Sequence, residues 1–213
     1  MKIRSHLMLL IPLVTVFLFQ GCAPAAITGA TTAVSTVAAD RRTTGTFIED
    51  EAIEIKSRLA LWDMKELSKR VHINFTSFNT TVLVSGEAPT EEDRQAVIDL
   101  VKNVEKVTKV HDEISIAAPS SMLSRSADAV VSAKIKAKLI AEKDLSSLHI
   151  KVVTEDGVTY LMGLVTEEEG DIATEIARRT GGVQKVVKLF EYREYLRKQN
   201  EEEEEPAQEG AAN

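Results

Sequence analysis

The chain has 213 residues, with 26 lysines and arginines against 33 aspartates and glutamates, for a formal net charge of −7. Apolar residues make up 44% and aromatic residues 5%, which excludes a disordered chain, a collagen and a multi-span membrane protein. The acidic balance argues against nucleic acid as a partner, because binding nucleic acid requires a basic surface. A single cysteine and four widely spaced histidines give neither a disulfide framework nor a zinc-binding spacing.

Residues 1–21 have the pattern of an export signal. A short basic start precedes an apolar run from Leu7 to Phe19, which as a helix would span about 20 Å, less than the ~30 Å hydrocarbon core of a membrane. The pattern therefore predicts a signal peptide rather than a transmembrane helix. Gly21 directly precedes the only cysteine, Cys22. This arrangement resembles a bacterial lipobox, with Phe19 where leucine is usual, and the resemblance implies that Cys22 is lipidated and becomes the mature N-terminus.

A lipidated Cys22 would anchor the protein, because each buried methylene contributes ~0.8 kcal/mol and several acyl chains together bind almost permanently. Ala23 follows the cysteine instead of aspartate. By resemblance to lipoprotein sorting, this implies transport to the outer membrane, facing the periplasm. Residues 22–46 are mostly small and are predicted to form a flexible tether. Residues 192–213 contain five consecutive glutamates and are predicted to be an acidic disordered tail.

The middle of the chain is an internal repeat. The segment from His72 to Gly86 aligns with the segment from His149 to Gly163 at a constant offset of 77. Each copy has about 70 residues, the size of a small domain. We therefore predict one domain at 47–117 and a second at 124–191. The connecting segment, 118–123, is short, so the two domains are expected to pack against each other with some relative motion.

Each repeat is predicted to fold in the order α-β-β-α-β, an α+β domain in which two helices cover a three-stranded mixed sheet. The expected core positions of the first helix are Ile55, Leu59 and Met64 in the first copy, and Val131, Ile135 and Leu139 in the second.

Local signals place the other elements of each repeat. Asn79 in the first copy and Glu155-Asp156-Gly157 in the second mark hairpin turns. The second helix should begin at a capping box, Thr90 with Asp93 and Thr166 with Glu169, of which the second is better formed because glutamate is preferred. The third strand is predicted at 107–116 and at 183–190.

The candidate reactive residues of the sequence do not form the pattern of a catalytic site. His72 and His149 occupy the same repeat position without further ligands at metal spacing, so both are expected to be structural, and His111 is expected at a solvated strand edge. Gly181-Gly182 lacks the lysine and serine or threonine of a phosphate loop and indicates a helix end. We therefore predict a protein that is not an enzyme, with no cofactor, metal or small-molecule substrate.

Three stretches of the sequence carry a resemblance to a known family. They are 40–46 (DRRTTGT), 151–157 (KVVTEDG) and 161–167 (LMGLVTE). Together with the α-β-β-α-β order and the Val-x-x-Val third strand, they resemble the BON domain of bacterial envelope proteins. Two tandem copies behind a lipobox resemble the dual-BON outer-membrane lipoproteins. The resemblance covers roughly residues 18 to 190, and it implies binding of phospholipid, a palmitate-type anchor and a role in envelope stress and cell division.

Charge separates the two repeats. Segment 124–143 carries five basic residues against two acidic ones, whereas its counterpart 47–70 carries five against six. A basic helix with apolar residues near its start suits an anionic membrane surface. The resemblance implies that this helix binds anionic phospholipid, and the candidate lipid-binding residues are Met122, Leu123, Val130, Lys134 and Lys138. Val130 stands where the family has an interfacial tryptophan, which predicts shallower insertion.

Two alternatives stay open at this point. The lysine-rich face is equally compatible with an ordinary solvated helix surface. The protein would then be an interaction scaffold for envelope proteins in assembly or stress response, without direct lipid recognition. A periplasmic hydrolase is the third reading, and it lacks any nucleophile–base pair in the sequence pattern.

Overall fold

A computed structural model describes residues 40–193. The predicted signal peptide, the predicted lipidation site Cys22, residues 22–39 of the predicted tether and residues 194–213 of the predicted acidic tail lie outside the described residues. The first repeat comprises α3 (Thr44–Asp63), α4 (Lys65–Ser68), β1 (His72–Phe78), β2 (Thr81–Ala88), α5 (Glu91–Lys102) and β3 (Lys109–Ile116). The second repeat comprises α6 (Met122–Ala141), a short 3-10 helix η1 (Ser147–His149), β4 (Ile150–Glu155), β5 (Val158–Val165), α7 (Glu167–Arg178) and β6 (Lys185–Tyr192).

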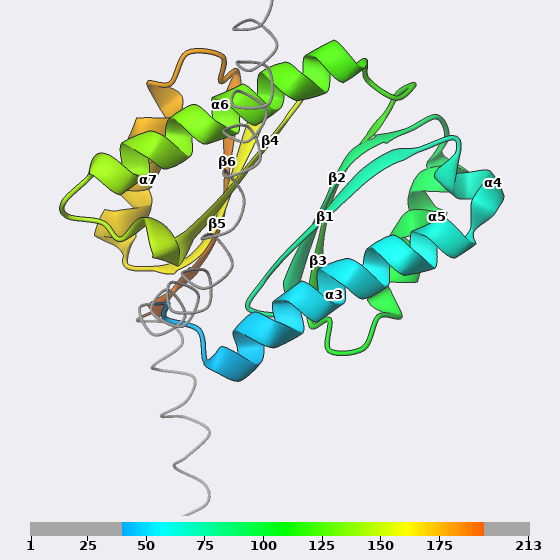
Figure 1. Ribbon diagram of the computed structural model, residues 1–213, viewed down its shortest axis with the longest axis horizontal. Helices are drawn as coiled ribbons and strands as arrows, with labels where there is room; N and C mark the ends of the chain where they lie inside the picture. The colour runs from blue at the N-terminus through cyan, green and yellow to red at the C-terminus, as the bar shows by residue number, and fades with distance from the viewer. Residues whose placement is uncertain (1–39, 194–213) are drawn as a thin grey trace, which may run out of the picture. The chain divides into compact units, whose positions relative to one another are not determined.

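Both repeats have the predicted sheet. In each, the first two strands pair antiparallel as a hairpin, and the third strand pairs parallel with the second. The second strand is therefore central, in the orders β1-β2-β3 and β4-β5-β6. In each repeat the two long helices lie on one face of the sheet, α3 and α5 in the first and α6 and α7 in the second (Figure 1). The α+β class and the α-β-β-α-β order are thus confirmed, with the extra short α4 in the first repeat and η1 in the second.

One buried aspartate in the first helix of each repeat fixes the hairpin turn. The carboxylate of Asp50 accepts hydrogen bonds from the amides of Asn79 and Thr80, each at 2.8 Å. Asp128 accepts from the amides of Asp156 and Gly157, each at 3.0 Å. The turn residues have positive φ, so these amides point outward and need an acceptor. Asp50 and Asp128 are therefore structural counterparts.

A glycine near the end of the second strand is required by close backbone packing. Gly86 has a φ of 122°, and a Cβ there would lie 2.0 Å from the carbonyl oxygen of His72. In the second repeat, a Cβ on Gly163 would lie 2.5 Å from the carbonyl oxygen of His149. A side chain at either position would force the paired strands apart.

The first helix of the first repeat buries a different face from the one predicted. Ile53 and Leu61 are buried at 1% and 9% exposure, whereas Ile55, Leu59 and Met64 are 50%, 59% and 42% exposed. The prediction of these three as core residues was wrong. Apolar periodicity did not identify the buried face because that face also carries polar residues, among them Asp50, Glu54 and Ser57. Asp50 and Glu54 serve the hairpin with hydrogen bonds rather than apolar contact.

The core prediction for the first helix of the second repeat is confirmed. In α6, Val131, Ile135 and Leu139 are buried at 7%, 0% and 1%. The second helices bury Val97 and Val101 in α5, and Ala173 and Ala177 in α7, all at 0% exposure. Thr166 and Glu169 form a complete capping box at the start of α7. Thr90 caps α5 through the amide of Asp93, but the Asp93 carboxylate binds Arg70 instead of returning to the cap.

The two repeats pack against each other, as expected, through the strand residues that face away from the helices. In addition to the core of each repeat, an apolar cluster combines Phe78 and Leu83 of the first repeat with Tyr160 and Met162 of the second. Burial in this layer raises the pKa of the Tyr160 hydroxyl, and the charge of Glu113 adds to the effect. Each sheet therefore buries both faces, one under its own helices and one against the other repeat.

Polar contacts at the edge of this layer include residues of the predicted tether. Arg42 pairs with Asp50 at 2.7 Å, and its guanidinium carbon lies 4.1 Å from the ring centre of Phe78. Arg41 reaches the second repeat and pairs with Glu169 at 2.6 Å. The helix α3 begins at Thr44. The end of the segment predicted as a tether, residues 40–46, therefore belongs to the folded unit.

Candidate functional site

The predicted lipid-binding helix, α6, is built as the sequence pattern required. Ser121 caps its N-terminus by accepting a hydrogen bond from the amide of Ser124. The buried positions fix which face points outward. Three of the candidate residues lie on the exposed side: Met122, Leu123 and Val130 are 73%, 81% and 53% exposed. At 100° per residue, Leu123, Val130 and Lys134 share one outer strip of the helix.

The two candidate lysines differ in their surroundings. Lys134 is exposed, and its ammonium can reach a partner in solution. The Nζ of Lys138 donates to Thr180 Oγ1 at 2.9 Å and to the carbonyl oxygen of Arg179 at 3.4 Å. These acceptors lie at the C-terminal end of α7, where a cation stabilises the unpaired carbonyl groups. Lys138 therefore has a structural task in addition to any role at the surface.

A polar groove of about 450 Å³ lies between the two repeats, a feature that the sequence did not reveal. Its wall includes α3 and β1 from the first repeat, and α6 and β4 from the second. The charged or titratable side chains that line it include Glu54, Arg58, His72, Arg125, Lys136 and Glu155.

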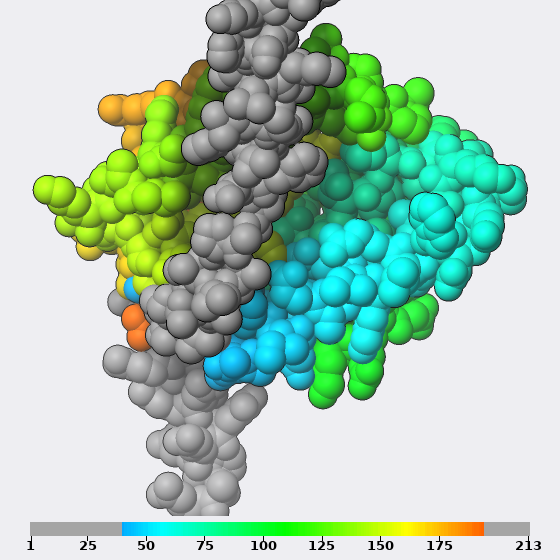
Figure 2. All heavy atoms as spheres, viewed as in Figure 1, coloured from blue at the N-terminus to red at the C-terminus, as the bar shows by residue number. Residues whose placement is uncertain are grey.

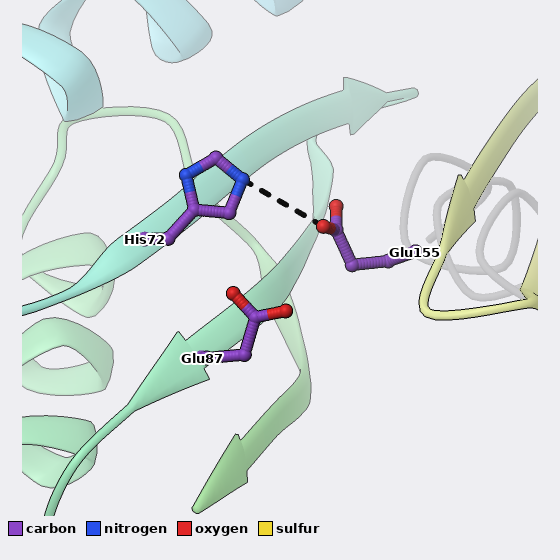
Figure 3. A group of neighbouring side chains, drawn as sticks. All are labelled: His72, Glu87 and Glu155. Carbon is purple, nitrogen blue, oxygen red and sulfur yellow. Dashed lines mark ion pairs between the residues drawn. The ribbon is translucent and has the colours of Figure 1, made fainter. Parts of the chain in front are cut away.

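Three potential metal ligands converge beside this groove (Figure 3). His72 on β1, Glu87 on β2 and Glu155 on β4 place one ligand atom each within 4.8 Å of one another. Glu87 and Glu155 are 5% and 8% exposed. The sequence did not reveal this cluster because its members come from three strands in two repeats, and a ligand motif is visible in a sequence only through its spacing along the chain.

Hydrogen bonding argues against a metal at this cluster. Arg125 Nη1 lies 3.2 Å from His72 Nδ1, so Nδ1 must act as the acceptor and Nε2 carries the proton. Nε2 lies 3.6 Å from Glu155 Oε1, directed toward that carboxylate. The residue types suit a divalent cation, but His72 Nε2, the histidine nitrogen that faces the glutamates, holds a proton. The positive charge of Arg125 already partly balances the negative charges of Glu87 and Glu155.

The electrostatics identify the cluster as a network that joins the repeats. Burial lowers the pKa of His72, and the nearby Arg125 charge lowers it further, so the imidazole is neutral. Burial raises the pKa of Glu155, helped by the charges of Glu87 and Asp128 and opposed by the hydrogen bond that Asn74 donates at 2.7 Å. The structural role predicted for His72 thus has a specific form, which is to bridge the two domains.

No helix within residues 40–193 has both the length and the apolar character needed to cross a membrane.

Comparison with known proteins identifies the domains. The model of the BON domain family matches residues 50–118 and 127–194. The outer membrane lipoprotein DolP of Haemophilus influenzae is 34% identical over 178 residues, which cover 84% of this chain and 91% of that protein. A 21 kDa hemolysin of Actinobacillus pleuropneumoniae is 32% identical over 72% of this chain and 79% of its own length. The osmotically-inducible protein Y of Escherichia coli is 33% identical over 67% of this chain and 72% of its own length.

The two family matches coincide with the two α-β-β-α-β units and cover more than half of the chain. The similarity to the Haemophilus influenzae lipoprotein runs through both units. The repeat found in the sequence is therefore a pair of BON domains, and the chain belongs to the BON family in the dual-domain, DolP-like arrangement.

Proposed function

We propose that this protein is a lipoprotein of the outer membrane, anchored through Cys22 and facing the periplasm, that binds anionic phospholipid through α6. The similarity to the outer membrane lipoprotein DolP of Haemophilus influenzae supports the location, and the lipobox pattern around Cys22 supports the anchor. In this role the protein supports envelope integrity under stress and during cell division. It acts by binding and not by catalysis.

The observation that carries the lipid-binding proposal is the outer strip of α6. Leu123 and Val130 expose apolar surface next to Lys134, whose ammonium is free to approach a phosphate. Each cation close to an anionic membrane surface contributes about 1 kcal/mol to binding. A few cations together therefore give weak binding that supplements the lipid anchor. The apolar pair near the start of the helix can enter the headgroup region.

Binding to vesicles tests the proposal. The chain from residue 23 to 213 lacks the anchor and keeps every described residue. It should sediment more with vesicles that contain phosphatidylglycerol than with phosphatidylcholine alone, and this excess should fall as salt rises. Lys134→Glu changes the local charge by two units and should weaken binding to anionic vesicles roughly tenfold, because about 1 kcal/mol is lost and repulsion is added.

A matched control is available in the first repeat. Lys56 occupies the place in α3 that Lys134 occupies in α6, when the helices are aligned on Asp50 and Asp128. Its Nζ lies 3.2 Å from Glu105 Oε2, so part of its charge is already balanced. Lys56→Glu should therefore weaken binding less than about threefold. Equal losses from both substitutions, or no loss from either, would favour the scaffold alternative, in which α6 is an ordinary solvated helix.

The anchor is tested separately. Cys22→Ser should remove the protein from the outer-membrane fraction, because no described helix can span a bilayer in its place. A Cys22→Ser variant that fractionates with the outer membrane at normal levels would contradict the anchor.

A further inference from the structure

The outer face of α3 carries an apolar stripe that the fold does not use. Ile48, Ile55, Leu59 and Trp62 are 62%, 50%, 59% and 71% exposed. Their spacing of seven, four and three residues places them on one face of the helix, opposite the buried Ile53 and Leu61. Figure 2 shows the outer side of α3, in cyan, on the face turned toward the viewer. We call these four residues the α3 stripe.

The second repeat shows that the stripe is not needed for folding. With Asp50 aligned on Asp128, the stripe corresponds to Ser126, Ala133, Ala137 and Ile140 in α6. The same domain thus forms with small residues at three of the four positions. Large exposed apolar groups arranged contiguously are uncommon on soluble surfaces and mark contact with a partner or a membrane.

We propose that the α3 stripe lies in the interfacial region of the lipid bilayer to which the protein is anchored, with Trp62 inserted among the headgroups. This rests on the anchoring part of the proposed function, and not on lipid binding by α6. Trp62 lies one residue before the last position of the helix, and an exposed indole with an apolar body and a polar N–H suits the membrane–water boundary.

Chain length places α3 within reach of a bilayer. Asp40 follows Cys22 by 18 residues, which span at most about 60 Å when fully extended. The first element after this connection is α3. A stripe one side chain wide on a convex helix also fits the soft boundary of a membrane better than it fits a groove of a folded protein.

Charge on α3 distinguishes this contact from the one proposed for α6. Lys56 and Arg58 flank the stripe, and the acidic Glu49, Glu51 and Asp63 flank it as well. Because the charges nearly cancel, the attraction of the stripe for a membrane must come from apolar burial. Binding through α3 should therefore occur on zwitterionic lipid and change little with salt, whereas binding through α6 requires anionic lipid.

The sole tryptophan of the chain makes this testable, because its fluorescence reports directly on the stripe. Residues 23–213 are mixed with phosphatidylcholine vesicles at low and high salt. The emission of Trp62 should shift to the blue and become protected from aqueous quenchers at both salt concentrations. Emission that does not change on phosphatidylcholine or on anionic vesicles would overturn the proposal.

Variants keep the result independent of α6. The double substitution Ile55→Ala and Leu59→Ala gives α3 the residues found at the same positions in α6, and it should weaken the phosphatidylcholine titration about tenfold or more. Ile140→Ala, which removes the α6 counterpart of Trp62, should leave the titration unchanged. Lys134→Glu should also leave it unchanged, so failure of the α6 proposal would not be confused with failure of this one.

Self-association is the competing outcome. If two chains met through the α3 stripe, the blue shift would appear with rising protein concentration in the absence of vesicles, and light scattering would show a doubled mass. That result, abolished by the Ile55→Ala, Leu59→Ala variant, would overturn the membrane contact. A monomer with a solvent-exposed Trp62 at every concentration, whose emission changes only with vesicles, supports it.

Discussion

The ion pair between Arg41 and Glu169 fastens the start of the folded chain to the second BON domain, and Glu169→Gln tests it. Both guanidinium nitrogens of Arg41 donate to the carboxylate, at 2.6 and 2.7 Å, and Arg41 Nη1 also donates to the carbonyl oxygen of Leu164 at 2.9 Å. The side chains are 19% and 13% exposed. Glutamine keeps an oxygen for the bonds from the Thr166 amide and Arg41 Nη1, so the substitution removes the charge and the acceptor of Arg41 Nη2.

The expected loss follows from the geometry. Hydrogen bonds to a charged partner contribute about 1.5–3 kcal/mol and neutral ones about 0.5–1.5 kcal/mol, so replacing the charge should lower the free energy of unfolding by about 1–2 kcal/mol. For a folded unit of this size that corresponds to a fall of about 3–6 °C in melting temperature. Glu175→Gln is the matched control on the same helix, where the ion pairs with Arg178 and Arg179 are exposed, and it should change stability by less than about 0.5 kcal/mol.

The pH dependence gives a second measurement. Burial opposes ionisation of Glu169, but the hydrogen bonds from Arg41 and from the Thr166 amide outweigh it and lower the pKa to about 2. The folded state therefore binds this proton less tightly than the unfolded state does. Its contribution is complete above the ordinary pKa of 4.5 and is lost as pH falls toward 2. The difference between wild type and Glu169→Gln should be full at pH 7 and shrink below pH 4. A Glu169→Gln variant as stable as wild type at pH 7 would refute the reasoning.

Two further predictions concern buried carboxylates. Asp50→Ala leaves two turn amides and the Ser77 hydroxyl without their acceptor and removes one of the two carboxylates that pair with Arg42, so it should lower the free energy of unfolding by about 3–5 kcal/mol. Asp128→Ala leaves only two amides and should lower it by about 2–3 kcal/mol; urea titration checks the order. Glu155→Gln should stabilise the protein at pH 7, because burial and the charge of Glu87 raise the pKa of Glu155 and make its ionised form unfavourable. In thermal melts the gain in stability should vanish as pH falls toward 4.5. A variant that is destabilised at pH 7 would contradict this.

The domain architecture could be predicted because each signal occurs twice. One hairpin signal is ambiguous, but Asn79 and Asp156-Gly157 occupy equivalent positions, and each is followed by a glycine, Gly86 or Gly163, that close packing requires. Local rules govern these features, and the two copies check each other. Agreement between repeats therefore took the place of the long-range information that a single sequence lacks.

The face of α3 could not be predicted from periodicity. The helix has apolar residues on two opposite sides, and the outer side, with Ile55 and Leu59, looks more like a core than the side that is buried. The buried side includes Asp50 and Glu54 because their carboxylates accept hydrogen bonds from the β1–β2 hairpin. Apolar periodicity assigns such residues to the surface, since it has no means of knowing that a distant turn offers donors.

The contacts between the domains were also beyond the sequence. Lys151 Nζ pairs with Glu54 Oε1 at 2.6 Å, across 97 residues, and His72 meets Arg125 and Glu155 across the same boundary. None of these pairs shares an element, so no spacing rule links them. Lys138 was placed in the lipid-binding set on the charge of its segment, its position beside the core face of the helix and the family resemblance, and the structure adds its bonds at the end of α7.

The two domains differ on the outer faces of α3 and α6, which the fold does not constrain. Asp50 and Asp128 perform the same task on the buried faces of α3 and α6, and Leu61 and Leu139 fill the same place in the two cores. The outer faces differ in kind, with an apolar stripe that includes Trp62 on α3 and a lysine-bearing strip on α6. Because neither outer face contributes to its own core, folding explains neither of them. An apolar face gains by leaving water and a cationic face gains by approaching phosphate, and an anionic bilayer surface offers both environments within a few ångströms of depth.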